Sequence, residues 1–170
     1  MKPYSVLIAL LLLCIASQAQ TQWSEITMKG RVSKINLSDS TEHLLNDTPI
    51  EIWVDDSLSS TIYTDEKGRY KFSLPFFHNY ELKYGREPFV QKSVEIDATD
   101  FSQTTMTRGF RLEIDITLFE DFEVPEFEFL SREPVAIASY NKVEDTVIWN
   151  AEHTETINQK IREAIKQNLK

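Results

Sequence analysis

Residues 64–75 have the sequence TDEKGRYKFSLP, which combines a tight turn with a strand in one short stretch. Apolar and polar residues alternate after the turn, so one face of the segment 69–74 is suited to burial. The alternating apolar residues are Tyr70, Phe72 and Leu74. In the turn, Asp65 can accept backbone hydrogen bonds and Gly68 can adopt a positive φ. The stretch predicts a hairpin with the preceding apolar segment 59–64, and it favours a structural role for the acids of the turn over a metal or acid-pair role.

The same two-residue alternation recurs along most of the chain. It is found in the segments 26–32, 49–55, 59–64, 69–74, 80–84, 90–96 and 111–118. Seven short strands that are each apolar on one side predict a mainly β protein, a seven-stranded antiparallel β-sandwich. Because no helical periodicity interrupts the segments, the pattern excludes a βαβ fold.

Five motifs resemble a known family. They are GRV (30–32), PIEIWVDD (49–56), TDEKGRYKFSLP (64–75), YELKYG (80–85) and RLEIDITL (111–118), and the best match to the family motif consists of Thr64, Asp65, Gly68, Tyr70 and Phe72. Over about residues 25–119 the chain resembles the carboxypeptidase regulatory-like domain, a transthyretin-like (prealbumin-like) β-sandwich. The resemblance implies a non-catalytic module that assists the folding of a neighbour or mediates contacts at the bacterial surface. The chain departs from the family in two ways: the polar loop 35–48 is long, and the usual large neighbouring domain is absent.

The N-terminal segment 1–19 has the features of a secretory signal peptide. Lys2 precedes an unbroken apolar run, 6–15, and the small residues Ser17 and Ala19 occupy the two positions that a signal peptidase inspects for cleavage after Ala19. The run is shorter than the roughly 20 apolar residues of a membrane-spanning helix, although a retained anchor remains an alternative. A lipidated Cys14 is a further alternative, which the large residue before it disfavours. We expect a periplasmic or secreted protein with no membrane span after cleavage, and association with the outer membrane is an alternative within this expectation.

Composition excludes several classes of function. The chain has 18 basic and 27 acidic side chains and a formal net charge of −9, so it has no general attraction for nucleic acid. One Cys cannot form an intramolecular disulfide. His43, His78 and His153 do not have the spacing of metal ligands, and the motifs of common catalytic sites are missing. We therefore expect no enzyme, no metal site and no cofactor.

The remaining residues, 120–170, form a C-terminal extension with three parts. An aromatic and acidic segment comes first; its acids could hold calcium or form a glycosidase pair, but packing of Phe122, Phe127 and Phe129 with the acids in water is favoured. A hairpin over 134–149 and an amphipathic helix over 151–169 are predicted next. The extension is similar to the tails of small secreted Bacteroidota proteins of unknown function, which supports the localisation.

Six apolar residues are candidates for binding: Trp53, Phe76, Phe77, Ile157, Ile161 and Ile165. Alternation places Trp53 on an outer face, where it could anchor a partner or be covered by the C-terminal extension, which is the favoured alternative. The three isoleucines form the apolar stripe of the helix, which packs either within the chain or in a partner's groove. We expect an accessory protein that binds another envelope protein. The alternative is a carbohydrate- or peptidoglycan-binding module in which Trp53, Phe76 and Phe77 stack on sugars.

Overall fold

A computed structural model describes residues 25–36, 41–101, 109–120 and 125–168. The predicted signal peptide, Cys14 and Phe122 lie outside these residues. The strands are β1 (Glu25–Asn36), β2 (Thr41–Leu44), β3 (Pro49–Val54), β4 (Ser57–Tyr63), β5 (Arg69–Pro75), β6 (Asn79–Tyr84), β7 (Lys92–Asp97), β8 (Phe110–Glu113), β9 (Ile116–Leu118), β10 (Ala136–Asn141) and β11 (Thr146–Trp149). The helical elements are the 3-10 helix η2 (Pro125–Ser131) and the α-helix α2 (Ala151–Asn168).

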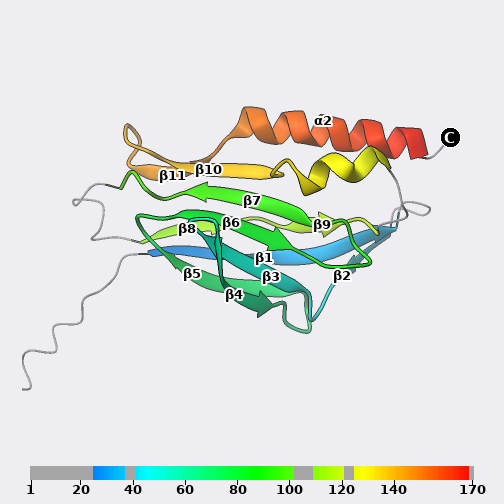
Figure 1. The fold of residues 1–170 in the computed structure, drawn as a ribbon, viewed down its shortest axis with the longest axis horizontal. Coiled ribbons are helices and arrows are strands. Elements are labelled where there is room, and N and C mark those ends of the chain that lie inside the picture. The colour runs from blue at the N-terminus through cyan, green and yellow to red at the C-terminus, as the bar shows by residue number, and fades with distance from the viewer. Residues whose placement is uncertain (1–24, 37–40, 102–108, 121–124, 169–170) are drawn as a thin grey trace, which may run out of the picture.

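The strands form two sheets that pack on each other, so the prediction of a mainly β sandwich with a C-terminal helix is confirmed (Figure 1). In the first sheet, β1 is central and pairs with β2 and β5 on one side and with β8 and β9 on the other. The second sheet has the order β11-β10-β7-β6-β3-β4. Inward side chains of both sheets, including Ile26, Ile50, Leu82 and Leu112, build one apolar core.

Three details of the strand prediction need correction. The pairings of β1 with β8 and β9 are parallel rather than antiparallel, and the pairing of β7 with β10, for which the sequence makes no prediction, is parallel as well. The predicted strand 111–118 is interrupted at 114–115, because the Asp115 carboxylate accepts the Arg31 N–H and the Ile114 carbonyl accepts the Tyr70 hydroxyl in place of main-chain partners. Gly30 permits this close approach: a Cβ there would lie 1.8 Å from the Ile114 carbonyl oxygen. The strand β2 lies in the predicted loop 35–48. Its four side chains are all exposed, so its sequence has no alternation of apolar and polar residues that would predict a strand.

The turn at 65–68 has the predicted chemistry but not the predicted role. Asp65 Oδ1 accepts the N–H groups of Lys67 and Arg69, both at 2.8 Å, and Gly68 has a φ of 66°. However, β4 pairs with β3 and β5 pairs with β1, so the turn carries the chain from one sheet to the other. The tight hairpin lies one strand earlier, at Asp55–Asp56. Both of these residues have a positive φ, which matches the right-handed twist of paired strands.

The C-terminal extension continues the second sheet. β10 pairs with β7, and β10 and β11 form the predicted hairpin. The α-helix α2 follows with Asn150 as its N-cap, whose Oδ1 accepts the His153 N–H at 3.0 Å. It lies along β10 and η2 (Figure 1). In the described part of the chain, no helix combines the length and the apolar character that crossing a bilayer demands.

A second apolar cluster forms where η2 and α2 meet the sheets. Its buried members are Phe119, Phe127, Leu130, Ile157 and Ala164, and partly buried Phe129 packs against it. The predicted packing of Phe127 and Phe129 is therefore confirmed. Of the acids, Glu128 is exposed, whereas Glu120 and Glu126 are half-buried.

Lys92 lies at the border of this cluster and is only 5% exposed. Its Nζ donates to the Thr117 carbonyl at 2.5 Å and lies 4.1 Å from the centre of the Phe119 ring. Burial lowers the pKa of Lys92 to about 7. Because Lys92 belongs to β7 and Thr117 to β9, this hydrogen bond joins the two sheets.

Candidate functional site

The outer face of the second sheet carries an excess of acidic side chains. Alternate residues of β6 and β7 point outward, and the cross-strand register places Glu81 directly opposite Glu95. Like charges in this position destabilise a sheet, so the arrangement is not one that the fold itself requires. Lys83 relieves part of the repulsion, since its Nζ lies 3.1 Å from Glu81 Oε2.

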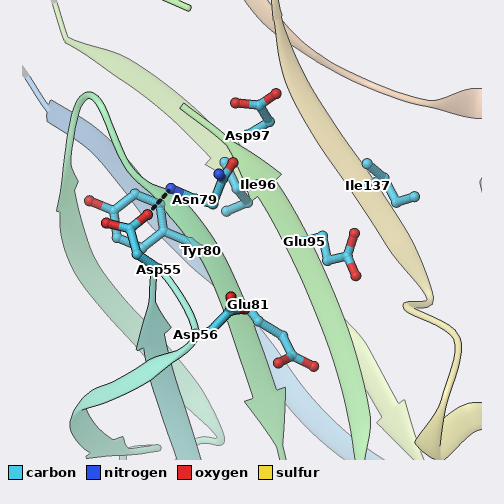
Figure 2. A pocket seen from close by; sticks show the side chains of 9 residues that line it. All are labelled: Asp55, Asp56, Asn79, Tyr80, Glu81, Glu95, Ile96, Asp97 and Ile137. Carbon is cyan, nitrogen blue, oxygen red and sulfur yellow. Dashed lines mark hydrogen bonds between the residues drawn. The ribbon is translucent and has the colours of Figure 1, made fainter. Parts of the chain in front are cut away.

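A shallow hollow of about 420 Å³ lies on this face, at the end where β3 turns into β4. Its lining residues are Asp55, Asp56, Asn79, Tyr80, Glu81, Glu95, Ile96, Asp97 and Ile137, which include five carboxylates. Figure 2 shows Glu81 and Glu95 on neighbouring strands and the Asp55 carboxylate beside the Tyr80 ring. We refer to this feature as the acidic hollow.

Asp55 is held in place by two partners. Its Oδ1 accepts the Asn79 N–H at 3.0 Å, the bond drawn in Figure 2, and its Oδ2 lies 2.7 Å from His78 Nδ1. The backbone hydrogen bond, followed by the interaction with His78, lowers the pKa of Asp55. Asp55 is thus a fixed negative charge at the rim of the acidic hollow, and its neighbour Asp56 adds a second carboxylate to the lining.

The chemistry of the acidic hollow favours recognition of positive charge. A glycosidase acid pair needs one carboxylic acid with a raised pKa. The pKa of Asp55 is lowered instead, so this residue carries a stable negative charge. Within the described residues, no three His, Cys, Asp or Glu side chains are grouped so that they could hold a metal ion. A surface with this charge attracts cationic groups.

Trp53 lies beside the acidic hollow on the outer face of β3, as the alternation predicts. Its side chain is half-buried, its Nε1–H donates to Glu51 Oε2 at 2.9 Å, and Lys83 Nζ lies 4.3 Å from the ring centre. The favoured interpretation, in which the C-terminal extension covers Trp53, needs correction. The cover comes from Lys83 on β6, whereas α2 lies beside β10, three strands away from β3 in the sheet.

A strip of apolar side chains continues from Trp53 to the last strand of the sheet. Leu58 lies directly opposite Trp53 in the cross-strand register, so both side chains are on the outer face. Thr61 and Tyr63 lie opposite Glu51 and Pro49 on the same face. Leu58 is 51% exposed and Tyr63 is 54% exposed. We call the residues Trp53, Leu58, Thr61 and Tyr63 the edge strip.

The two candidate phenylalanines lie in different environments. Phe76 is 5% exposed and stacks on Phe101 with ring centres 4.1 Å apart, so it is a core residue rather than half of a stacking platform. Phe77 is 47% exposed and has a φ of 73°, which is unusual for an aromatic residue. It lies next to His78, the partner of Asp55, at the hairpin end of β4.

The three candidate isoleucines lie on the face of α2 that packs within the chain. Ile157 is 1% exposed, and Ile161 and Ile165 are partly buried against the second apolar cluster. The structure thus describes the intramolecular alternative for Ile157, because that side chain has no surface left for a partner.

Leu58, Tyr63 and the acidic hollow are absent from the candidates that the sequence offers. The segment SLSSTIY has only a weak alternation of apolar and polar residues. It becomes a candidate binding surface because β4 is an edge strand of the sheet. The hollow draws residues from three strands and a hairpin, and no spacing in the sequence connects them. The one available signal is the uncharged character of 57–63 in a chain with 26% charged residues.

Comparisons with known proteins do not identify a family for this chain, so the fold is assigned from its own strand pairing. No family model matches the chain. No curated protein matches it either. Solved structures that share features with it include 3-chlorocatechol 1,2-dioxygenase from Rhodococcus opacus 1CP, with 11% identity over 61% of this chain and 62% of that one and a TM-score of 0.38. The minor pilin GBS52 of Streptococcus agalactiae has 12% identity over 58% of this chain and 45% of that one, with a TM-score of 0.41.

The Bacillus anthracis TIE protein has 17% identity over 56% of this chain and 17% of that one, with a TM-score of 0.39. The chain thus spans less than two thirds of the length of each of these three structures. At these identities and TM-scores, the activities and assemblies that their names describe do not transfer to this chain.

Proposed function

We propose that the chain is a non-catalytic accessory protein that binds another protein of the bacterial envelope through the outer face of its second sheet. The observation that carries the proposal is the edge strip, in which Leu58 and Tyr63 are each about half exposed beside Trp53. Apolar side chains that gather at one place on a surface are typical of interaction sites. Aromatic residues are also enriched where binding energy concentrates.

The surroundings of the edge strip describe the chemistry of the partner. An apolar centre next to a charged rim is the usual anatomy of a protein interface. Here the rim is the acidic hollow, with its five carboxylates. The partner surface that fits both parts presents apolar side chains flanked by lysine or arginine.

The cellular location belongs to the same proposal. We place the chain in the periplasm or outside the cell, with the option of association with the outer membrane. The support for this is the apolar run 6–15 and the small residues before a cleavage site after Ala19. Mass spectrometry of the N-terminus of the protein recovered from cell fractions tests this part, since a chain that begins at Met1 in the cytosol contradicts it.

The experiment for the proposed function compares two identical substitutions at two exposed apolar positions. Leu58→Asp adds a charge in the edge strip, and Val143→Asp adds the same charge at a position that is 95% exposed in the β10–β11 hairpin. Envelope extracts are passed over each immobilised full chain, and captured proteins are quantified. We expect Leu58→Asp to lose the partner that the native chain and Val143→Asp both retain. Equal capture by all three proteins contradicts the proposal.

A carbohydrate-binding function is the second candidate, and exposed Phe77 is the observation that favours it. An exposed aromatic ring can stack on a sugar, although Phe76 is buried and Lys83 lies over Trp53. Sedimentation with purified peptidoglycan separates the two candidates. Binding that is lost in Phe77→Ala but kept in Leu58→Asp supports the glycan function. If the native chain does not sediment with peptidoglycan, the glycan function is contradicted.

A further inference from the structure

The strand β4 forms an end of the second sheet and has one open side. Among the described residues it pairs only with β3. The Thr64 N–H donates to the Thr48 carbonyl at 3.1 Å, so Thr64 points its main-chain groups toward the β3 side. Because main-chain directions alternate along a strand, Ile62 also points toward β3, and Thr61 and Tyr63 point their N–H and C=O groups away from it.

Natural sheet edges are protected by lysine, proline or inward-pointing charges, by β-bulges, or by being very short. The register of β4 with β3 shifts between Ile52 and Trp53, near the start of β4, but the open side of β4 has none of the other protecting features. β4 has seven residues, SLSSTIY, with no charge and no proline. All of its side chains are exposed except the half-buried Ile62. Its main-chain groups are therefore accessible to another extended chain.

From this geometry we infer that β4 accepts an extended segment of the partner protein as an additional strand. The inference rests on the proposed function and specifies its mode: main-chain hydrogen bonds at Thr61 and Tyr63 supply affinity. Apolar side chains of the added strand that point to the outer face meet Leu58 and Tyr63. Basic residues at its ends meet the carboxylates that flank β4.

Charge distinguishes this occupant from a second copy of the chain. Acidic pairs flank β4 at both ends: Asp55 and Asp56 precede it, and Asp65 and Glu66 follow it. In an antiparallel pair of two β4 strands, the beginning of each strand lies beside the end of the other. Like charges would then meet at both ends, in a chain whose net charge is already −9. A basic-ended partner segment turns the same four carboxylates into favourable contacts.

The test uses short fluorescent peptides of alternating valine and threonine, one with lysines at both ends and one with glutamates. Each is titrated into the full chain, and binding is followed by fluorescence anisotropy. Thr61→Pro removes the outward N–H without touching a hydrogen bond to β3, and Thr61→Val keeps the N–H and a similar shape. Circular dichroism and the Tm verify that both variants are folded.

We expect the lysine peptide to bind the native chain and Thr61→Val alike, and Thr61→Pro to weaken binding about tenfold or more. The glutamate peptide is expected to bind at least about tenfold more weakly than the lysine peptide. Equal binding of Thr61→Pro and Thr61→Val overturns strand addition, as does no binding of either peptide. A native dimer that Thr61→Pro dissociates overturns the choice of occupant in favour of a second copy.

The proposed function can survive such a failure. If Leu58→Asp loses the envelope partner while Thr61→Pro keeps it, the partner binds through side-chain contacts with the outer face of the second sheet. No strand is then added at the edge of β4. If neither variant affects partner capture, both the strand addition and the proposed function fail.

Discussion

The strands β4 and β5 follow one another in the chain and each lies at an edge of a sheet, yet they are built differently. β4 has no charged residue, and Ile62 is its only side chain that is not exposed. β5 buries Tyr70 and Leu74, half-buries Phe72, and presents Arg69 and Lys71 to solvent. It also ends in Pro75. The first edge is open and lightly attached, and the second is anchored and protected.

The two edges differ in how readily each would pair with another strand. Charged side chains and proline at β5 discourage pairing with another strand, whereas β4 has neither. The arrangement at β5 also places Lys71 opposite Lys29 and Arg69 opposite Arg31. Glu113 and Asp115 relieve this repulsion by pairing with Lys29 and Arg31. Protection at β5 is thus kept even though it opposes like charges, whereas β4 carries no charge.

The largest expected effect on stability comes from the buried side chains that attach β5 to the core. Leu74 is 2% exposed, so Leu74→Ala should lower the free energy of unfolding by about 2–5 kcal/mol. Ile62→Ala, at a half-buried position of β4, should lower it by about 1–2 kcal/mol, because less apolar surface is lost. Urea unfolding of both variants measures the difference. Equal losses would show that β4 is anchored as firmly as β5 and would remove the contrast.

The second effect is a pH dependence of stability that arises in the interior, at Lys92, and involves neither edge strand. Lys92 has a pKa of about 7 in the folded chain and 10.5 as its ordinary value, so between these pH values the unfolded chain binds the extra proton. The free energy of unfolding should therefore rise with pH in this window. The expected rise from pH 7 to pH 9 is about 2 kcal/mol.

Lys92→Met is the matched control for this pH dependence. It fills a similar volume without an ionisable group, so it should abolish the rise, while the Thr117 carbonyl loses its donor. Urea unfolding at several pH values measures both proteins. A rise that persists in Lys92→Met would assign it to other groups. Binding of the lysine peptide at β4 should be the same in both proteins across this window, since Lys92 is buried away from the edge.

The third effect tests how β5 is held from its inner side. The Tyr70 hydroxyl donates to the Ile114 carbonyl at 2.7 Å and lies 3.2 Å from the Tyr84 hydroxyl. Tyr70→Phe leaves these buried groups without a partner and should lower the free energy of unfolding by about 1–3 kcal/mol. The same change at exposed Tyr63 on β4 should alter it by less than about 0.5 kcal/mol. Chemical denaturation of the pair checks this, and a larger loss at Tyr63 would reverse the comparison.

The smallest effect on stability comes from removing the protection of β5. The double change Arg69→Thr and Lys71→Thr relieves repulsion across β1 and should alter the free energy of unfolding by about 0.5 kcal/mol or less. Its consequence should appear in association instead, because the edge then resembles β4. Analytical ultracentrifugation should show concentration-dependent self-association in this variant. A strictly monomeric variant would mean that charge is not what closes the β5 edge.

Local patterns in the sequence predict most of the fold, and they fail where distant segments meet. The alternation at Tyr70, Phe72 and Leu74 predicts β5, and the stripe of isoleucines predicts α2. Pairing partners are a different matter, since the turn at Asp65 suits a hairpin but carries the chain between two sheets. Nothing local reveals the parallel pairing of β7 with β10, which depends on residues about forty positions apart in sequence.

The candidate surface is predicted only in part for the same reason. The outward direction of Trp53 follows from the period of β3. The exposure of Leu58 and Tyr63 follows from the position of β4 at the end of the sheet, which is a property of topology. Phe76 is expected from the sequence to be exposed for binding but is buried, because Phe101 from another segment packs against it.

Hydrogen exchange of individual main-chain amides, measured by NMR with and without the lysine peptide, shows whether β4 takes up an added strand. The Thr61 and Tyr63 amides should exchange rapidly in the free chain and become protected when the peptide binds, while the outward amides of β5 should not change. Bound peptide with no protection at Thr61 and Tyr63, or equal protection at both edges, would contradict strand addition at β4.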